Sequence, residues 1–151
     1  MNAPQEFIDA LSAELTRKFG PGTPSKYTVE VREPVEGELK VAADAKQMFI
    51  TTEGFDFPEG VADQGELTRI TVPVMLSVVM KRPSSVLMSA QTLARRLTVA
   101  QALQRVVKSF AYSHPEVMVT PLSEQPMLIE GYYVSVTGVE LDFDLDCEVS
   151  L

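Results

Sequence analysis

VELDFDLDCEVSL, residues 139–151, alternates apolar and polar side chains without interruption. Every odd-numbered position is apolar, and five of the six even-numbered positions carry a carboxylate. Successive side chains of a β-strand point to opposite faces, so this pattern predicts a long strand with one buried and one solvated face. The stretch therefore predicts a sheet that packs against a core.

A second long strand is predicted from Ile70 to Met80, where every even-numbered residue is apolar. Pro73 has no N–H to donate to a ladder, so this stretch is expected at a sheet edge or at a bulge. Shorter strands are predicted at Lys26–Arg32, in the region Glu38–Thr52 with a break near Ala43, and around Val117–Val119.

An N-terminal helix is predicted between Asn2, a possible capping residue, and the Gly20–Pro21 stop. Its apolar residues recur at the three- and four-residue spacing of one helix face. They are Phe7, Ile8, Leu11, Leu15 and Phe19.

A central helical region carries two apolar stripes that point well over a right angle apart. The first contains Leu93 and Leu97, and the second runs from Val99 to Phe110. One straight helix cannot bury both stripes against one sheet, and Thr98 with Gln101 has the spacing of a capping box. These features predict a short helix at 89–97, a break or kink, and a main helix at 99–112.

Two loops are predicted, at about residues 53–66 and 122–131, from their glycines and prolines. Phe55 and Phe57 lie in the first loop. The favoured interpretation is that both rings tuck beneath the loop, and the alternative is that they form a contact loop for a partner.

Together these elements predict a single α+β domain over residues 1–151, which are 45% hydrophobic. A mixed, mainly antiparallel sheet is packed by the N-terminal helix and a central kinked or broken helix.

The net charge of −8 is unevenly distributed along the chain. Residues 1–108 hold 13 acidic and 13 basic side chains, whereas residues 109–151 hold eight acidic and no basic ones. Within the first part, residues 81–108 hold six basic and no acidic side chains, so a basic block precedes the acidic one. Opposite charge blocks of this kind indicate two surfaces that attract each other. The candidate acidic face is Glu140, Asp142, Asp144, Asp146 and Glu148, and the candidate basic interface is Arg95, Arg96, Arg105 and Lys108.

The role of the acidic face stays open among a solvated strand face, a partner contact, and a channel wall that repels DNA.

No motif predicts catalysis, a cofactor or a metal. His114, the sole histidine, is expected to be a solvated loop residue, and Cys147, the sole cysteine, a buried and inert one. The acidic net charge of the chain argues against specific nucleic-acid binding. The sequence has no run of about 20 apolar residues, so it predicts no membrane-spanning helix.

The order of elements resembles the tail terminator and related neck-region ring proteins of tailed bacteriophages. The resemblance spans nearly the whole chain but is one of layout, without an invariant motif. It is carried by the opening helix with Phe7, Ile8, Leu11 and Leu15, the strand Ile70–Met80, the helix end Gln101–Val107, and the closing strand Val139–Leu145.

This resemblance implies a structural virion protein rather than an enzyme, assembled in the host cytoplasm and located in the tail or neck. Its expected partners are further copies of itself, with a hexamer favoured, and other tail or neck proteins. DNA would pass through the ring without being bound specifically. The alternatives are a small binding module that acts through the Phe55/Phe57 loop, and an enzyme whose site forms between subunits.

Overall fold

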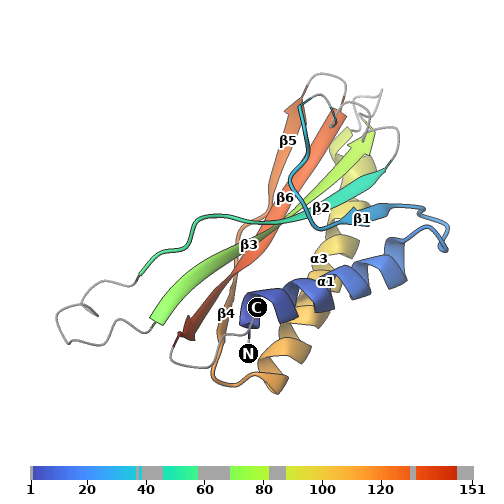
Figure 1. The fold of residues 1–151 in the computed structure, drawn as a ribbon. Helices are drawn as coiled ribbons and strands as arrows, with labels where there is room; N and C mark the ends of the chain where they lie inside the picture. The colour runs from blue at the N-terminus through green and yellow to red at the C-terminus, as the bar shows by residue number, and fades with distance from the viewer. Residues whose placement is uncertain are drawn as a thin grey trace.

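The computed structural model describes residues 2–36, 38, 46–57, 69–81, 88–129 and 132–145. These residues form a mixed, mostly antiparallel six-stranded sheet packed by two helices, which confirms the expected α+β fold (Figure 1). The elements are α1 (Ala3–Phe19), β1 (Thr28–Glu30), β2 (Gln47–Thr52), β3 (Arg69–Lys81), α3 (Met88–Ser113), β4 (Met118–Pro121), β5 (Gln125–Ile129) and β6 (Tyr132–Asp144).

β3 and β6 form the centre of the sheet. They pair antiparallel along their whole lengths, from Arg69 opposite Asp144 to Lys81 opposite Tyr132. β2 pairs antiparallel with the other side of β3, and β1 pairs parallel with β2. β4 and β5 share the remaining side of β6, so β6 has a partner on both sides along most of its length.

The sequence prediction of an unstructured loop at 122–131 is wrong, because residues 125–129 form β5. This strand pairs with the first half of β6, with Met127 opposite Val134. Met127 and Leu128 are both about half exposed, at 43% and 48%. β5 therefore owes its position to backbone pairing with β6, and it has no alternating pattern that could mark it in the sequence.

Pro73 lies in the interior of the sheet and not on an edge strand. Its carbonyl oxygen accepts from the N–H of Glu53, just beyond the last residue of β2. The N and C=O of one strand residue point to the same side, so the missing N–H of Pro73 also faces away from β6. The central β3–β6 ladder consequently loses no hydrogen bond at this proline.

The main core lies between the two helices and one face of the sheet. It contains the predicted stripe of α1, the even-numbered residues of β3 and the odd-numbered end of β6. Phe7 of α1 meets Phe110 of α3 edge to face, with ring centroids 5.3 Å apart. Asn2 caps α1 by accepting from the Gln5 N–H at 3.1 Å.

The predicted break in the central helix is wrong, because α3 is continuous from Met88 to Ser113. Thr98 lies in the helix interior and donates its hydroxyl to the Ala94 carbonyl instead of capping a second helix. One helix can carry both apolar stripes because only the second is buried. The stripe from Val99 to Phe110 packs on the core, while Leu93 and Leu97 of the first stripe are 45% and 60% exposed.

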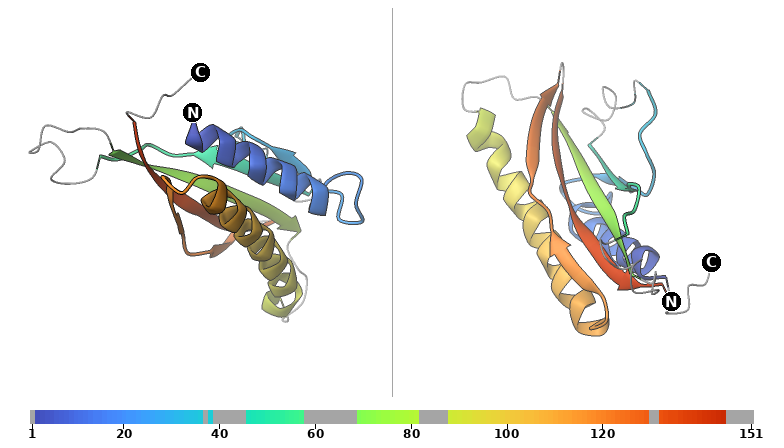
Figure 2. Two further views of the ribbon diagram at one scale, coloured as in Figure 1. Left: turned by 90° about the horizontal axis from the view of Figure 1, so that it is seen from below. Right: turned by 90° about the vertical axis from the view of Figure 1, so that its left-hand side faces the viewer.

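A second, smaller cluster lies on the opposite face of the sheet. Phe49, Val79 and Val134 are buried there, and the Arg32 guanidinium lies 5.3 Å from the Phe49 ring centroid. Figure 2 shows α3 on one side of the sheet and the segment that follows β1 on the other. Arg32 is held over Phe49 by ion pairs to Glu30 and Glu38.

Candidate interaction surfaces

The described part of the acidic face lies on β6, on the side away from the helices. Glu140, Asp142 and Asp144 alternate there with the core residues Leu141 and Phe143. Asp146 and Glu148, like Cys147, lie outside the described residues. The predicted acidic face is therefore described at three of its five positions.

Asp142 has a basic partner within the chain. Asp142 accepts from Arg69 Nε at 2.8 Å and from the Thr71 hydroxyl at 3.4 Å, both on β3. This ion pair neutralises part of the negative charge of the acidic face, which the sequence analysis considered as a contact for a partner.

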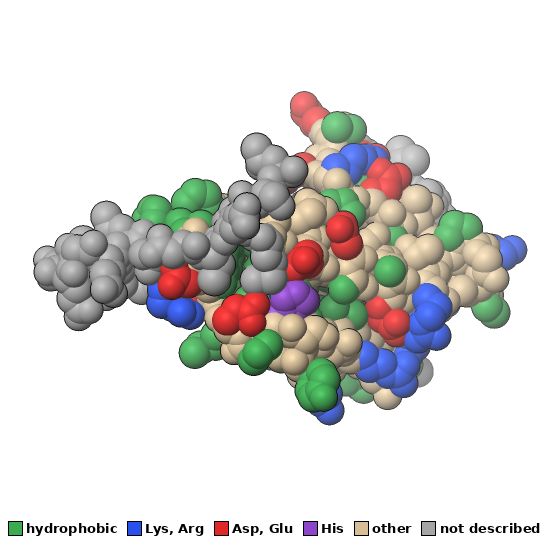
Figure 3. All heavy atoms as spheres, turned by 60° about the horizontal axis from the view of Figure 1, so that its bottom comes forward, with side chains coloured by type: hydrophobic (Ala, Val, Ile, Leu, Met, Phe, Trp, Pro, Cys, Tyr) green, Lys and Arg blue, Asp and Glu red, His purple; other side chains and the backbone are tan. Residues whose placement is uncertain are grey.

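Two of the four basic candidates also have partners within the chain. The Arg95 guanidinium lies over the Phe19 and Tyr27 rings, 5.6 and 5.4 Å from their centroids. Arg96 donates to both carboxylate oxygens of Glu124, at 2.5 and 2.7 Å. In the view of Figure 3 acidic and basic side chains are interspersed and do not form two separate fields. Arg105 and Lys108 remain exposed on α3, and their role at an interface stays a prediction.

The Arg96–Glu124 pair joins α3 to the segment between β4 and β5. Glu124 also accepts from the buried Ser135 hydroxyl on β6, at 2.7 Å. Hydrogen bonding from Arg96, with a smaller contribution from Ser135, holds the pKa of Glu124 below its ordinary value of 4.5. Sequence reasoning missed this cluster, because its three residues are far apart in the chain.

Glu124→Gln is expected to lower the free energy of unfolding near neutral pH by about 1–2 kcal/mol. The lowered folded-state pKa of Glu124 stabilises the fold above the unfolded-state pKa, and this stabilisation is lost as pH falls through the folded-state value. The variant should therefore lose less stability than the wild type on acidification, as measured by urea unfolding between about pH 7 and pH 3.

The matched control is Glu14→Gln, because the ion pair of Glu14 joins it to Arg17, three residues away on the same helix, and links no two elements of the fold. It should change stability by less than about 0.5 kcal/mol. Equal acid sensitivity of the wild type and Glu124→Gln would show that the Arg96–Glu124 pair contributes nothing.

His114 does not behave as the solvated loop residue that the sequence predicted. Its Nε2 lies 2.9 Å from a Glu6 carboxylate oxygen, and its Nδ1 lies 3.2 Å from the Phe110 carbonyl oxygen. The imidazole stacks on the Phe110 ring at 4.1 Å. The Nε2–Glu6 contact joins the end of α3 to the start of α1, and the Nδ1 contact with Phe110 holds the imidazole against its own helix, which is a structural role.

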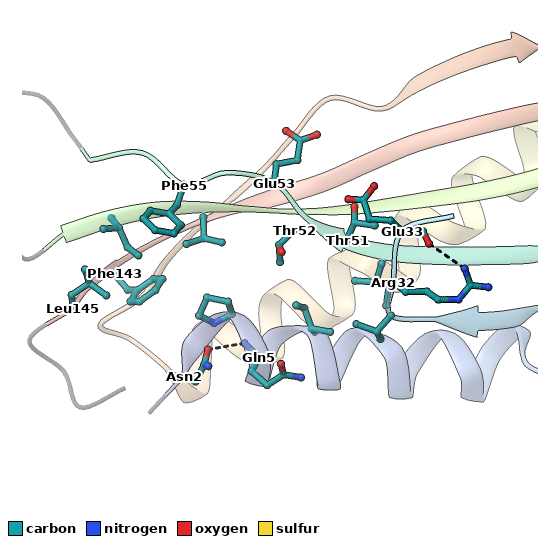
Figure 4. A pocket seen from close by; sticks show the side chains of 16 residues that line it. Asn2, Gln5, Arg32, Glu33, Thr51, Thr52, Glu53, Phe55, Phe143 and Leu145 are labelled. Atoms are coloured by element: carbon teal, nitrogen blue, oxygen red, sulfur yellow. Dashed lines mark hydrogen bonds between the residues drawn. The ribbon is translucent and has the colours of Figure 1, made fainter. Parts of the chain in front are cut away.

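An apolar groove of about 520 Å³, hereafter the groove, is formed by described residues of several elements. It lies between the start of α1 and the ends of β2, β3 and β6 (Figure 4). Its apolar lining is Pro4, Ile8, Val31, Ile50, Phe55, Ile70, Val72, Phe143 and Leu145. Asn2, Gln5, Arg32, Glu33, Thr51, Thr52 and Glu53 form its polar rim.

Phe55 and Phe57 lie beside the groove and are 57% and 54% exposed, so the prediction that they tuck beneath a loop is wrong. The backbone of Asp56 pairs with that of Thr71 on β3 through two hydrogen bonds of 2.9 and 3.0 Å. This pairing extends the chain along β3, so the two rings flanking Asp56 share one side and meet edge to face at 6.0 Å. Residues 58–66 of the predicted loop lie outside the described residues.

Leu93 and Leu97, hereafter the leucine pair, form a second exposed apolar surface on the first half of α3. Arg96, between them in sequence, is tied through Glu124 to Ser135 near the start of β6. The groove lies at the other end of β6, beside Phe143. At about 3.3 Å per strand residue, the stretch of β6 from Ser135 to Phe143 spans about 26 Å, so the two surfaces lie toward opposite ends of the sheet.

Neither a metal centre nor a membrane span is found in the part of the chain that the structure describes. No three His, Cys, Asp or Glu side chains converge there on a position that could hold a metal ion. Neither of the described helices combines the length and apolar character that crossing a bilayer requires.

No protein-family model matches the sequence, and a comparison with curated proteins finds no match. The likeness to phage tail terminators is therefore a likeness in the order of elements, and it stays a prediction. What the chain does has to be inferred from the groove, the leucine pair and the charged faces.

Proposed function

We propose that this chain is a ring-forming structural protein of a phage or phage-like tail, a tail terminator or head–tail connector component. The observation that carries the proposal is the presence of two unlike apolar surfaces, the groove and the leucine pair, at opposite ends of the sheet. A head-to-tail contact between identical subunits needs two such different surfaces, and repetition of that contact gives a ring when the rotation from copy to copy closes.

The order of elements adds support. An opening helix, the strand β3, the helix α3 and the closing strand β6 follow one another in the order that carries the resemblance. Glu140 and Asp144 lie on the sheet face away from the helices, where carboxylates would repel DNA if that face lined a channel. A hexamer is the favoured assembly.

Negative-stain electron microscopy of the purified chain tests the proposal directly. The expected result is a uniform population of rings with a central hole. Featureless particles of the size of one 16.6 kDa chain would contradict it.

A second candidate function is a small protein-binding module that acts through Phe55 and Phe57. This function is favoured by the exposure of both rings beside the groove. Exposed apolar patches of this kind often mark the contact surface for a partner. Under this function the chain stays monomeric, and the Phe55→Ser/Phe57→Ser variant loses partner binding while its melting temperature stays within about 2 °C of the wild type. Tyr112→Ser, at a residue that is 90% exposed on α3, is the control that should bind normally.

A further inference from the structure

We propose that the groove of one copy receives the leucine pair of the next copy, so that copies of this chain join head to tail. This inference rests on the self-association proposed above and names the contact that produces it. The contact would bury Leu93 and Leu97, two apolar side chains that are exposed in a single copy.

The groove has the size and chemistry to take two aliphatic side chains. Its volume of about 520 Å³ lies within the range of roughly 300–1,000 Å³ that small-ligand pockets span. Ile70, Val72 and Phe143 are each at most 7% exposed and form a preformed apolar floor. Figure 4 shows Thr52 pointing from β2 toward α1 across the opening, so polar groups border the groove without filling it.

The leucine pair suits this groove because its two side chains lie four residues apart on one rigid helix. Residues at this spacing lie on the same side of a helix, which is how amphipathic helices enter apolar grooves. Other exposed apolar side chains fit less well. Met127 and Leu128 are adjacent on β5 and point to opposite faces, and Met118 lies opposite Asp142 on the acidic face.

Charge complementarity favours the same pairing. The groove rim carries Glu33 and Glu53, and its one cation, Arg32, is already paired with Glu30 and Glu38. α3 has no acidic residue from Met88 to Ser113, and of its four basic residues Arg105 and Lys108 are exposed, whereas Arg95 and Arg96 are engaged within their own chain. An acidic rim would therefore attract this helix and would repel the β6 side of a second copy.

The placement of the two surfaces makes the contact intermolecular. Figure 1 shows the first half of α3, which carries the leucine pair, near the end of β3. The groove is lined by Ile70 and Phe143 at the other end of the β3–β6 pair, so a copy cannot fill its own groove. Each copy offers one groove and one leucine pair, and the contact can therefore repeat from copy to copy.

Two blocked variants test the contact. Leu93→Asp/Leu97→Asp places charge on the exposed leucine pair, and Thr52→Trp fills the groove from an exposed rim position. Each variant alone is expected to associate on the order of 100-fold more weakly than the wild type and to sediment at the mass of one chain. Tyr112→Asp, at an exposed position on the same helix, is the matched control and should assemble normally.

Mixing the two blocked variants in equal amounts gives the decisive result. The mixture contains one intact groove and one intact leucine pair for each two chains, so it should form a dimer of twice 16.6 kDa and nothing larger. A mixture that stays at the mass of one chain, or either variant assembling as the wild type does, overturns the inference. Rings formed by both variants would overturn this contact and leave the proposed function standing, whereas a wild type that forms no ring removes both.

Discussion

Replacing Phe7 by alanine is expected to lower the free energy of unfolding by about 3–5 kcal/mol, the usual loss for a large aromatic side chain removed from a core. Phe7 is fully buried on α1 and packs edge to face against Phe110 of α3. Its removal would leave a cavity between the helices and also take away the ring that supports Phe110 beneath His114. Urea unfolding followed by circular dichroism measures the effect as a lower midpoint.

The control for this variant is Thr16→Ala, on the exposed side of the same helix. It should change stability by less than about 0.5 kcal/mol. A loss below about 1 kcal/mol for Phe7→Ala would mean that α1 is not packed on the core as described.

Gly138→Val is expected to have the second large effect, a destabilisation of at least about 1–3 kcal/mol. Gly138 lies opposite Met75 in the central strand pair. A Cβ atom added there would lie 2.3 Å from the Val74 carbonyl oxygen and 3.0 Å from Met75 Sδ. The nearer atom is backbone in the middle of the sheet, so the strands themselves would have to move apart.

Gly54→Ala is the matched control, because a Cβ atom at Gly54 would meet nothing within 4 Å. Thermal unfolding of both variants separates a local clash from a general cost of losing glycine. Equal melting temperatures for Gly138→Val and the wild type would contradict the β3–β6 register.

The sequence pattern located the central strands because apolar and polar residues alternate along them. β3 was predicted within two residues of its observed ends, but β6 begins at Tyr132 and not at Val139. The start of β6 escaped detection because Ser135 and Thr137 occupy core-facing positions while Val134 is buried on the opposite face. With both faces covered, the strand loses the alternation that marks its second half.

The predicted break in the central helix was wrong because of one assumption. The prediction assumed that every apolar stripe must be buried against the sheet of the same chain, so two stripes seemed to require two helices. The structure keeps one helix and leaves Leu93 and Leu97 exposed. The leucine pair is therefore an exposed apolar surface of α3 and not part of the core.

The candidate surfaces depend on tertiary placement that no local pattern encodes. The groove combines Pro4 of α1, Thr52 of β2, Val72 of β3 and Phe143 of β6. Likewise, Asp142 gains Arg69 only because β3 and β6 pair in one particular register. Composition could locate the charge blocks, but it could not tell which charges find partners within the chain.

Self-association through two different surfaces is the central claim, and the molar mass at sedimentation equilibrium tests it most directly. Across a wide range of protein concentrations, the wild type should approach a fixed multiple of 16.6 kDa, with six copies favoured. A mass that stays at 16.6 kDa at every concentration would contradict it.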